Sequence, residues 1–150
     1  MIRQAKIADA EQIQRLINQF ADEGRLLARS LSEIYDNLRD FFVSVAGDGQ
    51  VTGVCALHIS WEDLAEIRSL AVTTAERKKG IGGTLISACL EEAKQIGVKR
   101  VFLLTYIPDY FARSGFHAVD RSALPHKIWA DCIRCVKFPE CDETAMILDL

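Results

Sequence analysis

The sequence predicts an α/β fold with a mixed, mostly antiparallel central sheet flanked by helices. Three observations carry this prediction. The chain opens with a strand and two amphipathic helices, its middle holds β-branched and aromatic runs around a Gly-Asp-Gly turn, and its second half reads strand, helix, strand. Because a strand–helix–strand unit joins two parallel strands by a crossover, we expect one parallel pair within the sheet.

Length and composition are those of one globular domain, which we expect to span 1–150. Of the 150 residues, 49% are hydrophobic and 26% are charged. The formal net charge of −3 argues against a nucleic-acid partner, since such proteins carry a basic excess. The N-terminal segment is interrupted by Arg3, Lys6, Asp9 and Glu11, so we expect no signal peptide, no membrane partner and a cytoplasmic protein.

The first third of the chain predicts a strand at 2–7 followed by two helices. Asp9 followed by Gln12 has the spacing of a capping box, and Gly24 is expected to end the helix that begins there. The apolar face of this helix consists of Ile13, Leu16, Ile17 and Phe20. A second capping box, Ser30 with Glu33, predicts a helix that runs to Phe41 or Phe42.

The rest of the chain alternates strands and helices. Residues 42–59 predict a hairpin around Gly47-Asp48-Gly49, and Gly97 is expected to stop a long helix. The other elements are strands at 65–72, 100–106 and 144–148, and helices at 82–96 and 109–114.

A glycine-rich loop, RKKGIGG at 77–83, lies between the strand at 65–72 and the long helix. Glycines let the backbone approach an anion, and the first N–H groups of a helix point at it, so the loop indicates a phosphate-bearing ligand. The alternative is a tight turn with solvated lysines. A P-loop would need Lys and then Ser or Thr after Gly82, and a dinucleotide fingerprint would need glycine at Leu85, so ATP and NAD are disfavoured.

This stretch resembles the GNAT superfamily of acetyltransferases, whose signature is Arg or Gln, two residues, Gly, one residue, then Gly or Ala. The segment LAVTTAERKKGIGGTLI matches it, and RVFLLTY with FARSGF extends the resemblance over essentially the whole chain. The resemblance implies the GNAT fold and acetyl-CoA as co-substrate. The resemblance implies that CoA is held by Arg77, by the backbone of Leu70, Ala71 and Val72 at the pantetheine and thioester, and by backbone amides at the pyrophosphate, which are those of Lys78, Lys79, Gly80, Ile81, Gly82, Gly83 and Thr84.

Transfer to an amine needs a proton acceptor, because a free α-amine is mostly protonated at neutral pH. Glu66 lies on the strand that leads into the glycine loop and matches a glutamate that is thought, in GNAT enzymes, to draw off this proton through water. The alternative is a carboxylate paired with Arg68, whose charge would lower its pKa in the wrong direction for a base.

The leaving thiolate is protonated in many GNAT enzymes by a tyrosine four residues before the glycine of the closing Gly-Phe pair. Phe111 occupies this position here. Tyr110 is adjacent but about 100° away around a helix, so Tyr110 is our candidate acid and Tyr106 a substitute. Without the usual acid, catalysis would rest mainly on positioning and desolvation.

A closer resemblance is to bacterial N-acetylglutamate synthases of the short, single-domain kind. The segments that show this resemblance are LLARS at 26–30, AEIRSLAV at 65–72, VFLLT at 101–105, LPHK at 124–127 and 129–142. This resemblance implies glutamate as the acceptor, in the first step of arginine biosynthesis. Longer enzymes of this kind bind a substrate carboxylate with an Arg-Ser pair after the first helix, so Arg29 is implied as the anchor.

A dicarboxylic acceptor asks for a second cationic contact, because a guanidinium donates two parallel hydrogen bonds to one carboxylate. Arg68 is our candidate, and the other cations considered are Arg113, Lys127 and Arg134. A polyamine or aminoglycoside site should be rich in carboxylates, whereas the loop after the first helix carries Arg25 and Arg29. This difference favours an anionic acceptor.

The odd count of five cysteines, with no export signal, indicates reduced thiols or metal ligation before disulfides. Four candidate zinc ligands near the C-terminus include a Cys-x-x-Cys: they are His126, Cys132, Cys135 and Cys141. A second Cys-x-x-Cys pair is missing, so we predict no metal and a reduced loop over the substrate side. Cys55 and Cys89 are expected to be small buried hydrophobes.

Two other functions stay open at this point. The first is a GNAT enzyme that acts on another small amine or on a protein N-terminus. The second is a non-catalytic module that binds acyl-CoA, which the missing tyrosine would suit. A homodimer paired through the last strand is possible, and the sequence does not decide it.

Overall fold

The computed structural model describes residues 1–22, 26, 28–124 and 143–150. Its sheet has the order β1-β2-β3-β4-β5-β7-β6, and β4 with β5 is the parallel pair in an otherwise antiparallel arrangement. The strands are β1 (Ile2–Gln4), β2 (Phe41–Val45), β3 (Val51–Trp61), β4 (Leu64–Val72), β5 (Arg100–Thr105), β6 (His117–Val119) and β7 (Thr144–Asp149). The predicted mixed α/β fold is confirmed.

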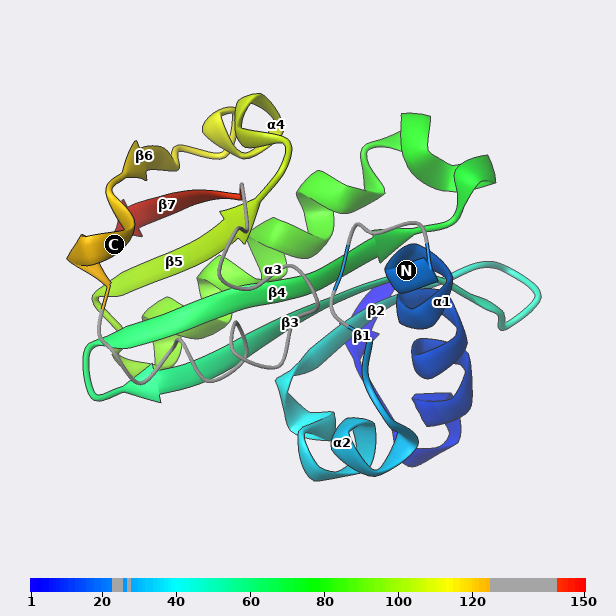
Figure 1. The fold of residues 1–150 in the computed structure, drawn as a ribbon. Coiled ribbons are helices and arrows are strands. Elements are labelled where there is room, and N and C mark those ends of the chain that lie inside the picture. The colour runs from blue at the N-terminus through cyan, green and yellow to red at the C-terminus, as the bar shows by residue number, and fades with distance from the viewer. Residues whose placement is uncertain (23–25, 27, 125–142) are drawn as a thin grey trace.

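Helices cover both faces of this sheet (Figure 1). The α-helices are α1 (Ala10–Asp22), α2 (Leu31–Asp36), α3 (Ile81–Ile96) and α4 (Pro108–Ala112). The 3-10 helices are η1 (Ile7–Asp9), η2 (Leu38–Asp40), η3 (Thr74–Lys79) and η4 (Arg121–Ala123). Among the described residues, no helix is long and apolar enough to cross a membrane.

Two large hydrophobic clusters lie on opposite faces of the sheet. On one face, α3 buries Leu85, Ile86 and Cys89 against inward residues of β3, β4 and β5. On the other, α1 and α2 pack against Val43, Val54, Ala56 and Ala71. Side chains of a strand alternate between the two faces, so each strand residue can be assigned to the α3 face or to the α1–α2 face.

The predicted capping box at Asp9 and Gln12 is wrong. Asp9 lies in η1, is buried, and accepts hydrogen bonds from the Arg3 guanidinium at 2.7 and 3.1 Å and from the Lys6 amide at 2.7 Å. Gln12 instead accepts a hydrogen bond from the amide of Val51 at 3.0 Å. The guanidinium of Arg3, six residues earlier in β1, therefore pairs with the carboxylate that local spacing had assigned to the cap. The predicted helix stop at Gly24 lies outside the described residues.

The second capping box is confirmed. Ser30 Oγ accepts from the amide of Glu33 at 3.1 Å, and Glu33 Oε1 accepts from the amide of Ser30 at 3.3 Å. The helix that follows is shorter than predicted, since α2 ends at Asp36 and β2 begins at Phe41. Phe41 is needed as a buried strand residue, and it packs into the cluster of the α1–α2 face.

The two parallel strands part after a short contact. Three pairs join them, from Leu64 with Arg100 to Glu66 with Phe102, and the described ladder does not extend to residues 67–72. Further along β4, Ser69 and Leu70 form a bulge, because both residues oppose Cys55 alone on β3. Ser69 has a φ of 59° there. The structure thus opens the sheet beside the second half of β4.

Candidate active site

The N-terminus of α3 has the geometry of an anion site. Gly80 is in the left-handed conformation with a φ of 76°, and it turns the chain from η3 into α3. The amides at Gly80 to Gly83 precede the first intrahelical bond, which Thr84 makes to the carbonyl of Gly80 at 3.1 Å. The Thr84 amide is therefore engaged in the helix, and the amides that can face a phosphate are those of residues 80–83.

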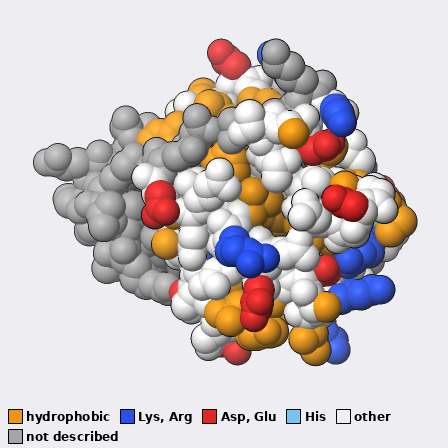
Figure 2. Space-filling model, turned by 90° about the vertical axis from the view of Figure 1, so that its right-hand side faces the viewer, with side chains coloured by type: hydrophobic (Ala, Val, Ile, Leu, Met, Phe, Trp, Pro, Cys, Tyr) orange, Lys and Arg blue, Asp and Glu red, His pale blue; other side chains and the backbone are white. Residues whose placement is uncertain are grey.

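The basic residues before these glycines lie on η3. Lys79 is exposed and pairs with Glu76 at 3.3 Å. The structure describes the backbone of Arg77 and Lys78, and their side chains lie outside what it describes. Figure 2 views the molecule from the side on which β4 ends and α3 begins, and hydrophobic side chains are visible in a hollow of that face with charged groups around it.

The predicted pantetheine residues form the last part of β4. Ala71 and Val72 pair with Val54 and Gly53 of β3, so the strand is held on that side. Toward β5 the described ladder ends at Glu66, and Leu70 to Val72 therefore line the gap between the parted strands. This gap leads directly to the N-terminus of α3.

Glu66 is the last residue of β4 that pairs with β5, so it stands where the two strands part. Arg68 lies two residues further on the same face, and its guanidinium is 3.6 Å from Glu66 Oε1. Both side chains are mostly buried, with 17% and 16% exposed. Their neighbours Ala65 and Ile67 pack on the α3 face, so Glu66 and Arg68 belong to the α1–α2 face.

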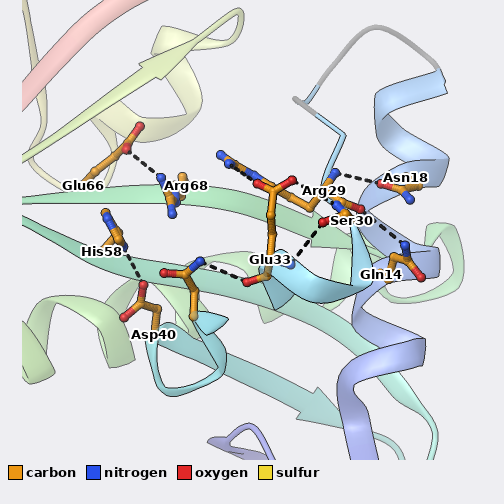
Figure 3. A network of polar contacts seen from close by, with 10 residues as sticks. Gln14, Asn18, Arg29, Ser30, Glu33, Asp40, His58, Glu66 and Arg68 are labelled. Atoms are coloured by element: carbon orange, nitrogen blue, oxygen red, sulfur yellow. Dashed lines mark hydrogen bonds and ion pairs between the residues drawn. The ribbon is translucent and has the colours of Figure 1, made fainter. Parts of the chain in front are cut away.

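Arg29 lies in the loop between α1 and α2, and α1 holds its backbone. Its amide donates to Asn18 Oδ1 at 3.1 Å, and its carbonyl accepts from Gln14 at 3.5 Å. The guanidinium is 3.4 Å from Glu33 Oε2 in α2, and only 9% of the side chain is exposed. In the view of Figure 3 the side chain extends from this loop in the direction of β4, where Arg68 and Glu66 stand.

A histidine and an aspartate that the sequence did not single out lie next to Glu66 on the same face. Together with Arg29, Glu33, Glu66 and Arg68 they form the wall of mixed charge. His58 Nδ1 is 2.6 Å from Asp40 Oδ2. His58 of β3 is the direct cross-strand partner of Glu66, and Asp40 is the last residue of η2. The sequence had predicted arginines around the acceptor, and this prediction was incomplete because a carboxylate lies next to each arginine. A histidine inside a mostly apolar strand is the signal that could have indicated His58 and Asp40.

The second predicted catalytic residue, Tyr110, is not next to Glu66. It packs with the cluster of the α3 face, and its hydroxyl lies so close to Gly82 that a Cβ added there would be 2.1 Å from it. Burial raises the pKa of Tyr110, so its phenol stays protonated near neutral pH. Phe111, at the family's tyrosine position, is buried in an edge-to-face contact with Phe116.

The cysteine predictions divide between described and undescribed residues. Cys55 and Cys89 are fully buried free thiols, as expected. His126, Cys132, Cys135 and Cys141 lie outside the described residues, and so does the prediction about a metal there. Within the part of the chain that is described, no group of metal-ligating side chains is large enough to hold an ion.

The structure thus combines a parallel pair of strands that part, a helix N-terminus with the geometry of an anion site, and acidic and basic side chains on one face. The model of the acetyltransferase (GNAT) family matches residues 8–117. The chain belongs to this family, and it is an acetyltransferase whose acetyl donor is acetyl-CoA.

Relatives with similar sequences extend this assignment. An uncharacterized N-acetyltransferase of Chlorobaculum tepidum is 42% identical over 149 residues, which are 99% of this chain and 96% of the relative. An amino-acid acetyltransferase of Mycobacterium tuberculosis is 32% identical over 89% of this chain and 78% of its own length. An amino-acid acetyltransferase of Neisseria meningitidis is 33% identical, and the match spans 29% of that longer relative.

Two crystal structures share the fold over the whole chain at 28% identity. One is a Mycobacterium tuberculosis protein in complex with CoA and NLQ, with a TM-score of 0.86 and 99% of that chain covered. The other is N-acetylglutamate synthase from Neisseria gonorrhoeae complexed with CoA and N-acetyl-glutamate, with a TM-score of 0.89 and 35% of that chain covered.

Proposed function

We propose that this chain transfers the acetyl group of acetyl-CoA to the α-amine of L-glutamate, as a cytoplasmic enzyme that opens arginine biosynthesis. The observation that carries the proposal is the wall of mixed charge on the α1–α2 face. It contains the guanidinium groups of Arg29 and Arg68 next to the carboxylates of Glu33 and Glu66, and the pair of His58 with Asp40. An amino acid is a zwitterion, and a wall with both signs offers partners to its carboxylate and to its ammonium.

Both arginines can bind a substrate carboxylate. Arg29 lies 3.4 Å from Glu33 and Arg68 lies 3.6 Å from Glu66, so both guanidinium groups belong to the same charged face. A carboxylate that docks bidentately on a guanidinium accepts two parallel hydrogen bonds. We therefore assign the two carboxylates of glutamate to Arg29 and Arg68.

Acetyl-CoA would occupy the gap between β4 and β5. Its pyrophosphate would lie on the amides of residues 80–83, and Leu70 to Val72 would pair with the pantetheine. Amides of this kind offer hydrogen bonds and the positive end of the helix dipole to a phosphate. The acetyl group would then reach the point where the strands part, next to Glu66.

At that point Glu66 would guide the proton away from the acceptor amine, through water. Tyr110 can contribute only a weak acid, because its raised pKa makes it a poorer proton donor than the departing thiol itself. The thiolate is a tolerable leaving group without such help. We therefore expect positioning of the two substrates to supply most of the rate.

The test is free-thiol release from acetyl-CoA with each amino acid supplied in turn. We expect glutamate to stimulate release, and glutamine and aspartate not to do so. Arg29→Gln should raise the KM for glutamate about 10- to 100-fold, since a hydrogen bond to a charged group contributes about 1.5–3 kcal/mol. Arg15→Gln, an exposed arginine of α1, is the matched control and should leave KM unchanged.

Two other results would replace this proposal. Release with another small amine, or with a peptide N-terminus, would keep the acetyltransferase and discard glutamate. Binding of CoA with no acetylation of any amine would indicate a non-catalytic module. The extent of the domain, 1–150, and a homodimer stay predictions that sedimentation and limited proteolysis can examine.

A further inference from the structure

His58 and Asp40 form a polar pair to which the proposed function assigns no chemical step. Their contact of 2.6 Å is among the shortest described in the molecule, and it joins residues 18 apart in the chain. Both side chains are reachable from solvent, with 34% of His58 and 24% of Asp40 exposed. The pair lies one strand away from the point where β4 and β5 part.

The pair fixes which ring nitrogen of His58 can accept a proton. An ionised carboxylate only accepts hydrogen bonds, so the contact with Asp40 requires the proton of the neutral ring to be on Nδ1. Nε2 then carries the lone pair. In Figure 3 the ring stands between Asp40 and β4, and the side away from Asp40 is directed to the strand that carries Glu66 and Arg68.

The register of the sheet places this nitrogen near the reaction. His58 is directly opposite Glu66 across the antiparallel pair of β3 and β4, and directly opposed residues have Cβ atoms about 4.5–5.5 Å apart. Glu66 in turn is the last β4 residue paired with β5, and Leu70 to Val72, the residues expected at the thioester, follow it on the same strand. His58 is therefore on the strand next to the one expected to hold the thioester, on the same face as Glu66 and Arg68.

Glu66 already has a cationic partner, because the guanidinium of Arg68 lies 3.6 Å from its Oε1. Imidazole is the side chain type whose charge changes most readily near neutral pH. We propose that His58, oriented by Asp40, is the group that finally accepts the proton which Glu66 guides away from the incoming amine, an inference that rests on the proposed acetyl transfer.

The proposed step moves two protons and one acetyl group. An N–H bond of the substrate ammonium breaks, and its proton forms a bond to Nε2 of His58, directly or through one water. The neutral amine forms a bond to the acetyl carbon while the carbon–sulfur bond breaks and the electron pair stays on sulfur. A second proton passes from the new amide nitrogen to the thiolate, and the imidazolium returns its proton to water. Asp40 stabilises the imidazolium and does not itself change charge.

The experiment measures kcat and KM for His58→Gln, Asp40→Asn and wild type by thiol release, with the amino acids and a panel of primary amines as acceptors. We expect His58→Gln to lower kcat about 100-fold, within the range found for loss of a general base, with the KM values nearly unchanged. Asp40→Asn should lower kcat less. His117→Gln, which alters an exposed histidine of β6, is the matched control and should behave as wild type.

A second measurement separates chemistry from folding. Imidazole added to His58→Ala should restore part of kcat, because it replaces a proton acceptor and cannot replace a contact between η2 and the sheet. Equal activity of His58→Gln and His117→Gln would overturn the inference and leave the proposed function intact. So would a loss that imidazole does not rescue and that comes with raised KM. A wild type that acetylates no amine would overturn both proposals.

Discussion

A methyl group added at Gly82 tests directly whether Tyr110 packs against the start of α3. A Cβ at Gly82 would lie 2.1 Å from the hydroxyl oxygen and 3.3 Å from Cζ of Tyr110. Non-bonded heavy atoms are most stable at about 3.5–4.0 Å, so Gly82→Ala has to displace the Tyr110 ring. That ring also packs edge-to-face on Phe111, with centroids 5.2 Å apart, and this contact would be lost or distorted.

The neighbouring glycine supplies the matched control. An added Cβ at Gly83 meets nothing within 4 Å, so Gly83→Ala should stabilise the helix by about 0.5–1 kcal/mol. Forced overpacking at Gly82 costs about 1–3 kcal/mol. Because both glycines lie in α3, both variants gain the helix stabilisation, and they should differ by the overpacking alone: about 1–3 kcal/mol, or roughly 2–12 °C in Tm for a chain of this length.

Thermal unfolding of the ligand-free protein is the assay, and a double variant makes it specific. Tyr110→Phe removes the oxygen at 2.1 Å and leaves the contact at 3.3 Å, so it should recover most of the stability that Gly82→Ala loses. If Gly82→Ala is as stable as Gly83→Ala, or if Tyr110→Phe has the same effect in both backgrounds, Tyr110 does not lie against the helix and our account of its position is wrong.

Two further predictions concern charge and reactivity in the interior. The guanidinium of Arg3 lowers the pKa of Asp9, so this pair contributes stability above the ordinary carboxyl pKa that is lost as pH falls through the lowered value. Asp9→Asn should destabilise the protein by about 2 kcal/mol at neutral pH and progressively less below about pH 4, measured by urea unfolding; Asp149→Asn, whose pair with Arg100 is exposed, should change little at any pH. A hydrogen bond to Cys89 and burial raise the pKa of Cys55 well above its usual range. At most three of the five thiols should therefore react with a thiol reagent in the native protein, and all five should react in denaturant. Reaction of more than three thiols before unfolding would contradict the burial of Cys55 and Cys89.

Much of the fold could be predicted because its signals are local. The Ser30 and Glu33 capping box, the turn at 47–49 and the glycine that ends α3 each depend on residues a few positions apart, and all were found where expected. Two predictions failed for different reasons. Asp9 pairs with Arg3 of β1 and not within the predicted cap, and β6 was missed because its three residues are short of buried positions and carry no clear pattern.

The candidate site could be predicted only in part, for a reason visible in β4. Alternation along a strand assigns faces by odd and even positions, but the bulge at Ser69 inserts one residue and reverses the assignment after it. Glu66 and Arg68 therefore share their face with Ala71, whereas Val72 faces α3. No local pattern in the sequence announces this shift.

By itself, then, the sequence determined the order of elements, the phosphate loop before α3 and the resemblance to acetyltransferases, since each of these follows from neighbouring residues. Only the tertiary structure decided which side chains meet. It placed His58 beside Asp40 and opposite Glu66, and it put the hydroxyl of Tyr110 against Gly82 on the other face. Such contacts depend on strand register and helix packing, which are set by the burial of the whole core and not by any single segment.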